Sequence, residues 1–315
     1  MSSKLASGTS DVALTEAPIS LKTYFICAFA SFGGILFGYD SGYINGVLGM
    51  TYVKRTYGGP VPESVDDSGF NVTTWQKSLI VSILSLGTFL GALLGGEVAE
   101  RIGRRPTIML SCLVFSIGVA VQTATSNVGG LVAGRVVAGL GVGGVSATVI
   151  LYVSEISPKR IRGLLVSVYQ WAITIGLLVS ACVNEGTKDF NNAASYRIPI
   201  GLQLVWAAIL AGGLGLLPES PRYYVKRGRL EDASRALSRV RGHPPHDSFV
   251  KAELAEIQAN FEYESRIASH SWLDLFHGGF RNPAGNFRRV LIGVFLQMFQ
   301  QWTGINFICE WSGLA

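Results

Sequence analysis

Long apolar stretches, separated by short polar or charged connections, dominate this chain. A helix needs about 20 mostly apolar residues to cross the hydrocarbon core of a bilayer. Six windows meet this requirement and a seventh begins near the C-terminus: Leu21–Leu48, Leu79–Val98, Thr107–Thr125, Val128–Val153, Leu164–Val183, Ile198–Leu217 and Val290–Ala315. Backbone polar groups in lipid must be hydrogen-bonded within their own segment, whereas a barrel would show alternating strands of about ten residues. The pattern therefore predicts an all-α membrane protein.

Composition agrees with this prediction and argues against an enzyme. Hydrophobic residues make up 49% of the 315 residues and charged residues only 15%, whereas soluble domains carry about 25% charged residues. The four cysteines lie in four different apolar stretches, without metal-like spacing. The histidines lie in one polar stretch, without ligand-like spacing or a nucleophile partner: His243, His246, His270 and His277. We expect no metal, cofactor or disulfide framework.

The positions of lysine and arginine predict the orientation, because cytoplasmic connections are enriched in these residues. Basic residues cluster after the second window, after the fourth window and, with twelve of them, between Glu219 and Arg289. The connection Thr51–Trp75 is neutral to acidic. These positions predict a cytoplasmic N-terminus and an outer Thr51–Trp75 loop, on which Asn71 begins a glycosylation sequon. The net charge of +5 is thus explained without a nucleic-acid partner.

The same patterning divides the chain into four regions. Residues 1–20 are polar and predicted to be a disordered cytoplasmic segment, and residues 21–217 form a six-helix transmembrane domain. Residues 218–289 are predicted to be a cytoplasmic helical linker, and residues 290–315 carry the beginning of a seventh span. Within the linker, helical spacing places two apolar sets each on one helix face: Leu230, Ala233, Leu237 and Val240, then Val250, Leu254, Ile257 and Phe261.

One motif resembles a nucleotide site by letter only. Gly139-x-Gly141-x-x-Gly144 matches the dinucleotide fingerprint, but that fingerprint has meaning only between a strand and a helix. Here it lies inside an apolar helix. Glycines in such helices let a neighbouring helix approach closely, as we also expect for Gly87, Gly91 and Gly95.

Two ionisable residues lie inside apolar windows, Asp40 in the first and Arg135 in the fourth. Charges in hydrocarbon are costly, so such residues usually face a bundle interior, pair and carry function. At about 1.5 Å per residue, both lie roughly 26–27 Å above the cytoplasmic ends of their helices, so they can meet. A carboxylate beside arginine stays ionised, and one that is separated and desolvated takes up a proton. The pair predicts a proton-coupling switch, with a static ion pair as the alternative.

Side-chain amides form a second polar group within the apolar windows. Gln170 lies in the fifth, and Gln300, Gln301 and Asn306 lie in the seventh. Amides donate and accept hydrogen bonds without charge, which suits a neutral polyhydroxyl ligand. Interhelical hydrogen bonding is the alternative, and it is stronger for the isolated Gln170.

Five short motifs follow one another along the chain. They are Gly96-x-x-x-Glu100-Arg101-x-Gly103-Arg104-Arg105, Gly134-Arg135, Glu155-Ile-Ser-Pro158-Lys-Arg-Ile-Arg162-Gly163, Pro218-Glu219-Ser220-Pro221-Arg222 and Gln300-Gln301-Trp-Thr-Gly304-Ile-Asn306. In this order and topology they resemble the sugar porter family of the major facilitator superfamily, most closely the fungal monosaccharide transporters. The resemblance covers roughly residues 20 to 308.

The resemblance implies a fold of two six-helix halves, each a 3+3 inverted repeat. This chain then holds the N-terminal half, the cytoplasmic helices and part of a seventh helix. Asp40 is implied as the protonatable residue with Arg135 as its partner, and Gln170, Gln300, Gln301 and Asn306 as sugar-binding residues. A cytoplasmic network that closes the inner side is implied for Glu100, Arg104, Arg105, Glu155, Arg162, Glu219 and Arg222. Because alternating access needs both halves, we expect this chain, with its C-terminal half missing, not to transport alone.

The predicted function is transport of a monosaccharide, a hexose such as glucose, coupled to protons by alternating access in the plasma membrane. Its partners would be the sugar, the proton and the lipid bilayer. Three alternatives remain. The chain can belong to a glucose sensor on the same fold, to a polyol, quinate or disaccharide porter, or to a non-transporting subunit that pairs with a partner half.

Overall fold

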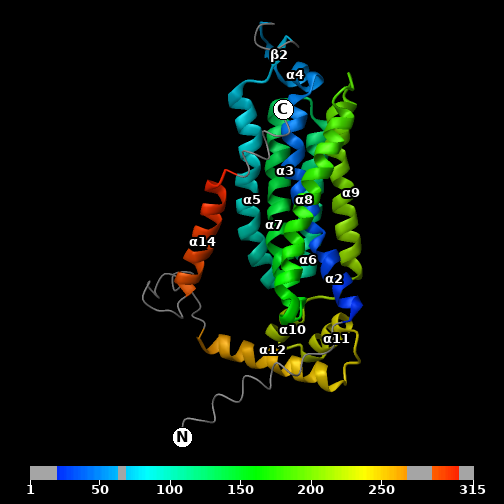
Figure 1. Ribbon diagram of the computed structural model, residues 1–315, viewed down its shortest axis with the longest axis vertical. Coiled ribbons are helices and arrows are strands. Elements are labelled where there is room, and N and C mark those ends of the chain that lie inside the picture. Colours follow the sequence, from blue (N-terminus) through cyan, green and yellow to red (C-terminus); the bar gives the residue numbers. More distant parts are fainter. Residues whose placement is uncertain (1–19, 63–68, 268–285, 305–315) are drawn as a thin grey trace. The chain divides into compact units, whose positions relative to one another are not determined.

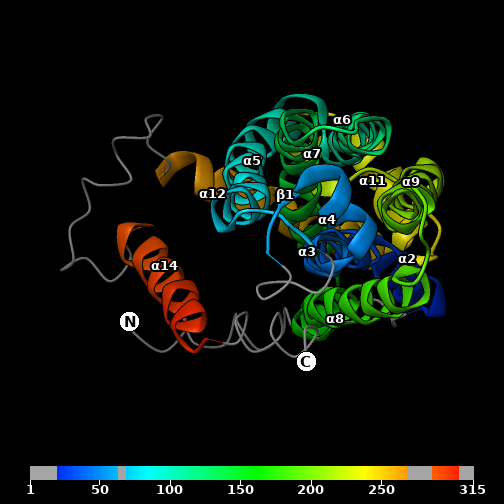
Figure 2. The same ribbon diagram turned by 90° about the horizontal axis from the view of Figure 1, so that it is seen from above.

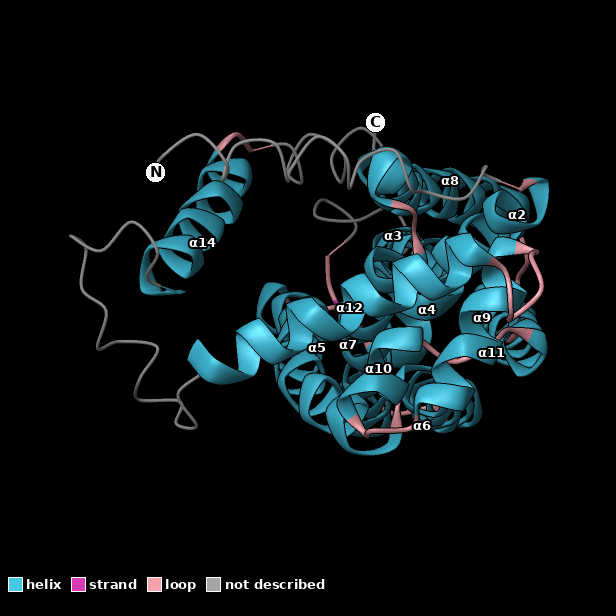
Figure 3. Cartoon of the chain, turned by 90° about the horizontal axis from the view of Figure 1, so that it is seen from below, coloured by secondary structure: helices cyan, strands magenta, loops and turns pink. Residues whose placement is uncertain are grey.

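The computed structural model describes residues 20–62, 69–267 and 286–304. They fall into two compact units, divided between Ile257 and Gln258. Most of this part of the chain is helical, as Figure 3 shows, and the rest consists of loops, turns and two short strands. The boundaries predicted at residues 20, 217 and 289 remain predictions.

All six predicted membrane windows are helices, which confirms the central prediction (Figure 1). The first span consists of α2 (Leu21–Ser31) and α3 (Gly33–Gly49), with a tight turn at Phe32, whose N–H donates to the Phe29 carbonyl at 3.0 Å. The other spans are α5 (Thr74–Ile102), α6 (Arg104–Ala124), α7 (Val128–Ile156), α8 (Arg162–Thr187), preceded by the 3₁₀ turn η2 (Lys159–Ile161), and α9 (Ala194–Leu216). Most extend past their windows because the helix continues into polar ends.

Glycines let several pairs of spans approach until their backbones touch. A Cβ added at Gly38 in α3 would lie 2.1 Å from the Ile173 carbonyl oxygen of α8, and one at Gly91 in α5 would lie 2.2 Å from the Leu140 oxygen of α7. The fingerprint glycines of α7 also pack against neighbouring helices, as expected. The hydropathy pattern could not identify Gly38 as a packing contact, because Gly38 is one of several small residues in the same span.

The pair α3 with α8 and the pair α5 with α7 are related by the expected repeat. Exchanging the first three spans with the second three converts the contact of α3 with α8 into the contact of α7 with α5, and both are extensive. The contact of α6 with α9 converts into itself. Seen along the bundle, α7 lies between α5 and α6 (Figure 2). This is the 3+3 arrangement of a major facilitator half.

A short cap lies at one end of the bundle, in the connection predicted to face outward (Figure 1). It contains α4 (Thr51–Tyr57) and the antiparallel pair β1 (Gly59–Pro60) and β2 (Phe70–Asn71). The Asn71 side-chain oxygen accepts a hydrogen bond from Lys77 Nζ at 2.9 Å, and Thr73 caps α5. Glycosylation at Asn71 remains a prediction.

The opposite end, which we call the basic end, carries the connections rich in arginine and lysine and the helices that follow the sixth span. These are α10 (Pro221–Lys226), α11 (Leu230–Arg241) and α12 (Ser248–Ile267). On the predicted apolar face of α11, Ala233, Leu237 and Val240 are buried, whereas Leu230 is 42% exposed. The reason is that α11 docks on α2 through its last turn, where Thr23 Oγ1 donates to the Val240 carbonyl at 2.7 Å.

The second unit contains α14 (Asn286–Trp302). It forms the described part of the predicted seventh span, and its apolar stretch, Val290–Trp302, is shorter than the six other spans. Residues 305–315, and with them Asn306, lie outside the described residues.

Candidate functional site

Asp40 and Arg135, predicted to meet at one depth, are in contact inside the six-helix unit. Arg135 Nη1 lies 3.5 Å from Asp40 Oδ1, and both side chains are 1% exposed. Asp40 comes from α3 and Arg135 from α7, the two helices that form much of the central packing. The guanidinium also donates through Nε to the Ile80 carbonyl of α5 at 3.4 Å. The pair is therefore sealed within this unit among three spans.

Two polar residues that the sequence analysis did not select complete this cluster. Tyr43 lies three residues after Asp40, which places both on one face of α3. Its hydroxyl accepts a hydrogen bond from Arg135 Nη1 at 3.1 Å and donates to Gln122 Oε1 of α6 at 2.8 Å. Arg135 Cζ also lies 5.5 Å from the centre of the Tyr43 ring, a distance at which a cation is attracted to the ring face.

Some buried polar atoms of this cluster form no hydrogen bond in the described structure. Asp40 Oδ2 and Gln122 Nε2 have no hydrogen-bond partner among the described residues, and the amide of Gln203, a residue of α9, lies beside Tyr43. All three side chains are at most 1% exposed. Buried polar groups are usually satisfied, so such a concentration marks a site with more than a packing role. The sequence did offer a signal for these two residues, because Gln122 is an amide within the third apolar window and Gln203 an amide within the sixth.

The amides predicted to bind sugar lie elsewhere. Gln170 is exposed on α8, and Gln300 and Gln301 are exposed on α14 in the second unit. They are exposed, whereas the Asp40 cluster is enclosed. Their role as sugar-binding residues remains a prediction.

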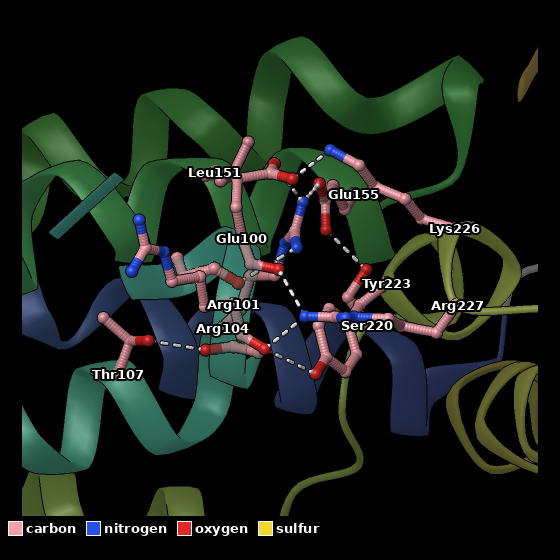
Figure 4. A network of polar contacts seen from close by, with 12 residues as sticks. Glu100, Arg101, Arg104, Thr107, Leu151, Glu155, Ser220, Tyr223, Lys226 and Arg227 are labelled. Carbon is pink, nitrogen blue, oxygen red and sulfur yellow. Dashed lines mark hydrogen bonds and ion pairs between the residues drawn. The ribbon is translucent and has the colours of Figure 1, made fainter. Parts of the chain in front are cut away.

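A second cluster centres on Arg104 at the basic end (Figure 4). The Arg104 side chain is 5% exposed, and its Nη2 lies 2.9 Å from Glu155 Oε1 and 3.2 Å from Glu100 Oε1. The second oxygen of Glu155 accepts a hydrogen bond from the Ser220 hydroxyl, and Glu100 forms an ion pair with Lys226. This cluster therefore connects α5, α6 and α7 to the segment that follows α9.

Glu219 caps the beginning of α6, where helix N–H groups lack partners and the helix dipole favours negative charge. Its carboxylate accepts hydrogen bonds from the backbone N–H of Arg104 at 3.0 Å, of Arg105 at 3.0 Å and of Ser220 at 2.8 Å. Gly103 makes room for it, with a φ of +105° and space in which an added Cβ would lie 2.6 Å from Glu219 Oε2. Burial raises the pKa of Glu219, and the three N–H donors and the Arg104 charge offset part of that rise.

Arginines also bind the last carbonyls of three spans at this end. Arg105 donates to the Gly215 carbonyl of α9, Arg227 to the Arg101 carbonyl of α5, and Arg241 to the Ile156 carbonyl of α7. A cation at a helix C-terminus is favourable because the carbonyl dipoles point toward it. The predicted network is thus extended by Lys226, Arg227 and Arg241, which a hydropathy pattern cannot assign to partners.

Five of the seven residues predicted for this network lie in it: Glu100, Arg104, Arg105, Glu155 and Glu219. Arg162 begins α8 and is half-buried. Arg222 is half-buried on α10 and is not among the partners of Arg104, Glu155 or Glu219 in the described structure. That the network acts as a gate remains a prediction.

The half-bundle and its 3+3 repeat have the fold of the N-terminal half of the major facilitator superfamily. The family of sugar (and other) transporters matches this chain over residues 26–312, and the chain belongs to that family. The family is one of transporters rather than enzymes.

Among curated proteins, the chain is 46% identical over 300 residues to the high glucose sensor RGT2 of Saccharomyces cerevisiae, covering 94% of this chain and 38% of the sensor. It is 45% identical over 283 residues to the major facilitator-type transporter ecdD of Aspergillus rugulosus, covering 90% of this chain and 51% of the relative. To the low-affinity glucose transporter HXT3 of S. cerevisiae it is 36% identical over 282 residues, covering 89% and 48%. The chain thus spans about half or less of the length of these relatives.

Among solved structures, the chain resembles the proton:xylose symporter XylE bound to 6-bromo-6-deoxy-D-glucose. The TM-score is 0.73 at 26% identity, covering 90% of this chain and 60% of the symporter. A partially occluded inward-open structure of the xylose transporter XylE from E. coli gives a TM-score of 0.71 at 25% identity, covering 91% and 65%. The likeness agrees with the predicted fold.

Proposed function

We propose that this chain forms the N-terminal half of a proton-coupled hexose transporter of the plasma membrane, with the basic end in the cytoplasm. The observation that carries the proposal is the buried Asp40–Arg135 pair, enclosed in a half-bundle of a sugar transporter family. The symporter XylE, which shares the fold, is named for coupling a sugar to protons. The sugar path would lie between this half and a second one.

The coupling step follows from the two oxygens of Asp40. Oδ1 faces the Arg135 guanidinium, whereas Oδ2 accepts no hydrogen bond from the described residues. Oδ2 is therefore the oxygen at which a proton would bind. Protonation would cancel the attraction between the two side chains, which is large in an interior of low dielectric constant. The helices α3 and α7 would then be free to change their relative positions.

The Arg104 cluster would act as the second element of the cycle. It joins three spans to the segment after α9 at the basic end. Buried and networked ion pairs can bias a two-state equilibrium by a few kcal/mol, unlike isolated surface pairs. We infer that the network stabilises the state in which the basic end is closed, and that its ion pairs separate when this end opens.

A glucose sensor is the second candidate, because the sensor RGT2 is 46% identical to this chain. A sensor must bind sugar and change conformation, and it need not move protons. The proton switch therefore separates the two candidates. Asp40→Asn is expected to abolish uphill uptake by a transporter and to spare glucose signalling by a sensor.

Hexose uptake tests the proposed transport. Cells without hexose carriers of their own would express this chain, the C-terminal half of a hexose-transporting relative, or both together. Because alternating access needs both halves, saturable uptake of labelled glucose is expected only when both are present. Glucose-dependent signalling without uptake would favour the sensor, and saturable uptake by this chain alone would contradict the division of labour between halves.

A further inference from the structure

We propose that Tyr43, held in place by Gln122, is a positioning residue of the proton switch: it keeps a hydrogen-bond acceptor on Arg135 when Asp40 is protonated. The inference rests on the proposed function, since it concerns how the Asp40–Arg135 pair changes its charge. Arginine does not lose its proton in proteins. When Asp40 becomes neutral, a guanidinium that is 1% exposed would otherwise remain without its principal partner, and such buried charges are costly.

The geometry gives Tyr43 the leading position among the acceptors of Arg135. The Nη1–hydroxyl distance is 3.1 Å, shorter than the 3.5 Å from the same nitrogen to Asp40 Oδ1 and the 3.4 Å from Nε to the Ile80 carbonyl. One nitrogen therefore divides its donation between a charged and a neutral acceptor. The Tyr43 ring also attracts the guanidinium through its face, with 5.5 Å between Arg135 Cζ and the ring centre.

Gln122 determines that the Tyr43 hydroxyl donates to the amide and accepts from Arg135. A phenol has one proton to donate, and arginine has no acceptor. The Tyr43 proton points to Gln122 Oε1 at 2.8 Å, so the oxygen lone pairs remain for Arg135. Without Gln122, the same hydroxyl could rotate and donate to Asp40, where it would stabilise the carboxylate instead of the guanidinium. The amide is thus the reason that Tyr43 is an acceptor.

The helices around this group supply no second counter-charge to Arg135 in the described structure. Helix α3 contributes Asp40, Tyr43 and Tyr39, whose hydroxyl donates to the Pro199 carbonyl at 3.0 Å. The remaining neighbours offer neutral groups: the Ile80 carbonyl of α5, Gln122 of α6, Asn184 of α8 and Gln203 of α9. The state with a protonated Asp40 therefore depends on neutral acceptors, and Tyr43 is the nearest of them.

The test is a pH titration of the purified chain in lipid nanodiscs, followed by infrared difference spectroscopy of the protonated carboxyl C=O band. Asp40→Asn identifies the band that belongs to Asp40. Tyr43→Phe keeps the ring and removes only the hydroxyl. We expect its Asp40 band to appear at a pH lower by at least about one unit, a tenfold loss in proton affinity. Gln122→Met is expected to shift the midpoint in the same direction by a smaller amount.

Tyr39→Phe is the matched control, because it removes the hydroxyl of a buried tyrosine one turn away that contacts a carbonyl rather than Arg135. Its midpoint is expected to equal that of the unchanged chain. An equal midpoint in Tyr43→Phe, or an equal shift in Tyr39→Phe, would overturn the role of Tyr43 and leave the proton switch standing. If no band disappears in Asp40→Asn at any pH, the proposed switch itself fails. Gln122→Met keeps the test available if Tyr43→Phe does not fold.

Discussion

Replacing Gly38 by alanine tests the close packing of α3 against α8, which positions Asp40 two residues further along. The added Cβ would lie 2.1 Å from the Ile173 carbonyl oxygen, and ordinary contacts begin at 3.4 Å. The helices must therefore separate by about 1.3 Å, and the obstacle is backbone that cannot rotate away. Such overpacking costs about 1–3 kcal/mol.

Gly212→Ala in α9 is the matched control, because nothing lies within 4 Å of its added Cβ. Alanine favours a helix over glycine by up to about 1 kcal/mol. This gain applies to both variants and cancels in their difference, which leaves the packing cost alone. An unfolding entropy of about 2.1 cal/mol/K per residue corresponds to about 1.5 °C per kcal/mol for 315 residues, so we expect Gly38→Ala to unfold at least about 1.5 °C below Gly212→Ala.

The assay is thermal unfolding of the two purified variants in one detergent, followed by circular dichroism. Equal midpoints would refute the backbone contact between α3 and α8. They would also remove the reason why Asp40 lies at a fixed place relative to Arg135.

Two further predictions concern the basic end. Glu155→Gln removes a charged partner of the buried Arg104 guanidinium, and we expect the free energy of unfolding to fall by up to about 3–5 kcal/mol. Glu97→Gln is the control at an exposed ion pair, and it should change the free energy of unfolding by less than about 1 kcal/mol. Equal losses in the two variants would contradict the burial of this cluster. Arg241→Met removes an ion pair to α12 and a hydrogen bond to the end of α7. Trypsin should therefore cleave the linker helices faster in this variant than in Arg239→Met, which changes an exposed arginine of the same helix. Equal cleavage rates would contradict the docking of α11 on α7 and α12.

The spans and the charged pair could be predicted from the sequence for a clear physical reason. Hydropathy reports transfer into lipid directly, and a fixed rise per residue converts sequence positions into depth. Asp40 and Arg135 are charges in separate spans at one depth, so pairing with each other was the expected way to avoid contact with lipid. Contact at 3.5 Å is the outcome.

The rest of the site depends on packing that no local pattern contains. Gln122 and Gln203 are single amides in apolar windows, and only the fold places them beside Tyr43. Arg104 lies next to a connection and would pass for a solvated residue, yet α10 folds back over it until the side chain is 5% exposed. Leu230 has the correct periodicity for burial and is exposed because only the other end of its helix meets α2.

Sugar accumulation under an imposed pH gradient tests the central claim most directly, namely that Asp40 couples protons to transport. The measurement compares the unchanged half-bundle with Asp40→Asn, each expressed with the same C-terminal partner half. The expected result is that Asp40→Asn still exchanges labelled glucose at equal concentrations and no longer accumulates it against its gradient. Undiminished accumulation in Asp40→Asn would contradict the account.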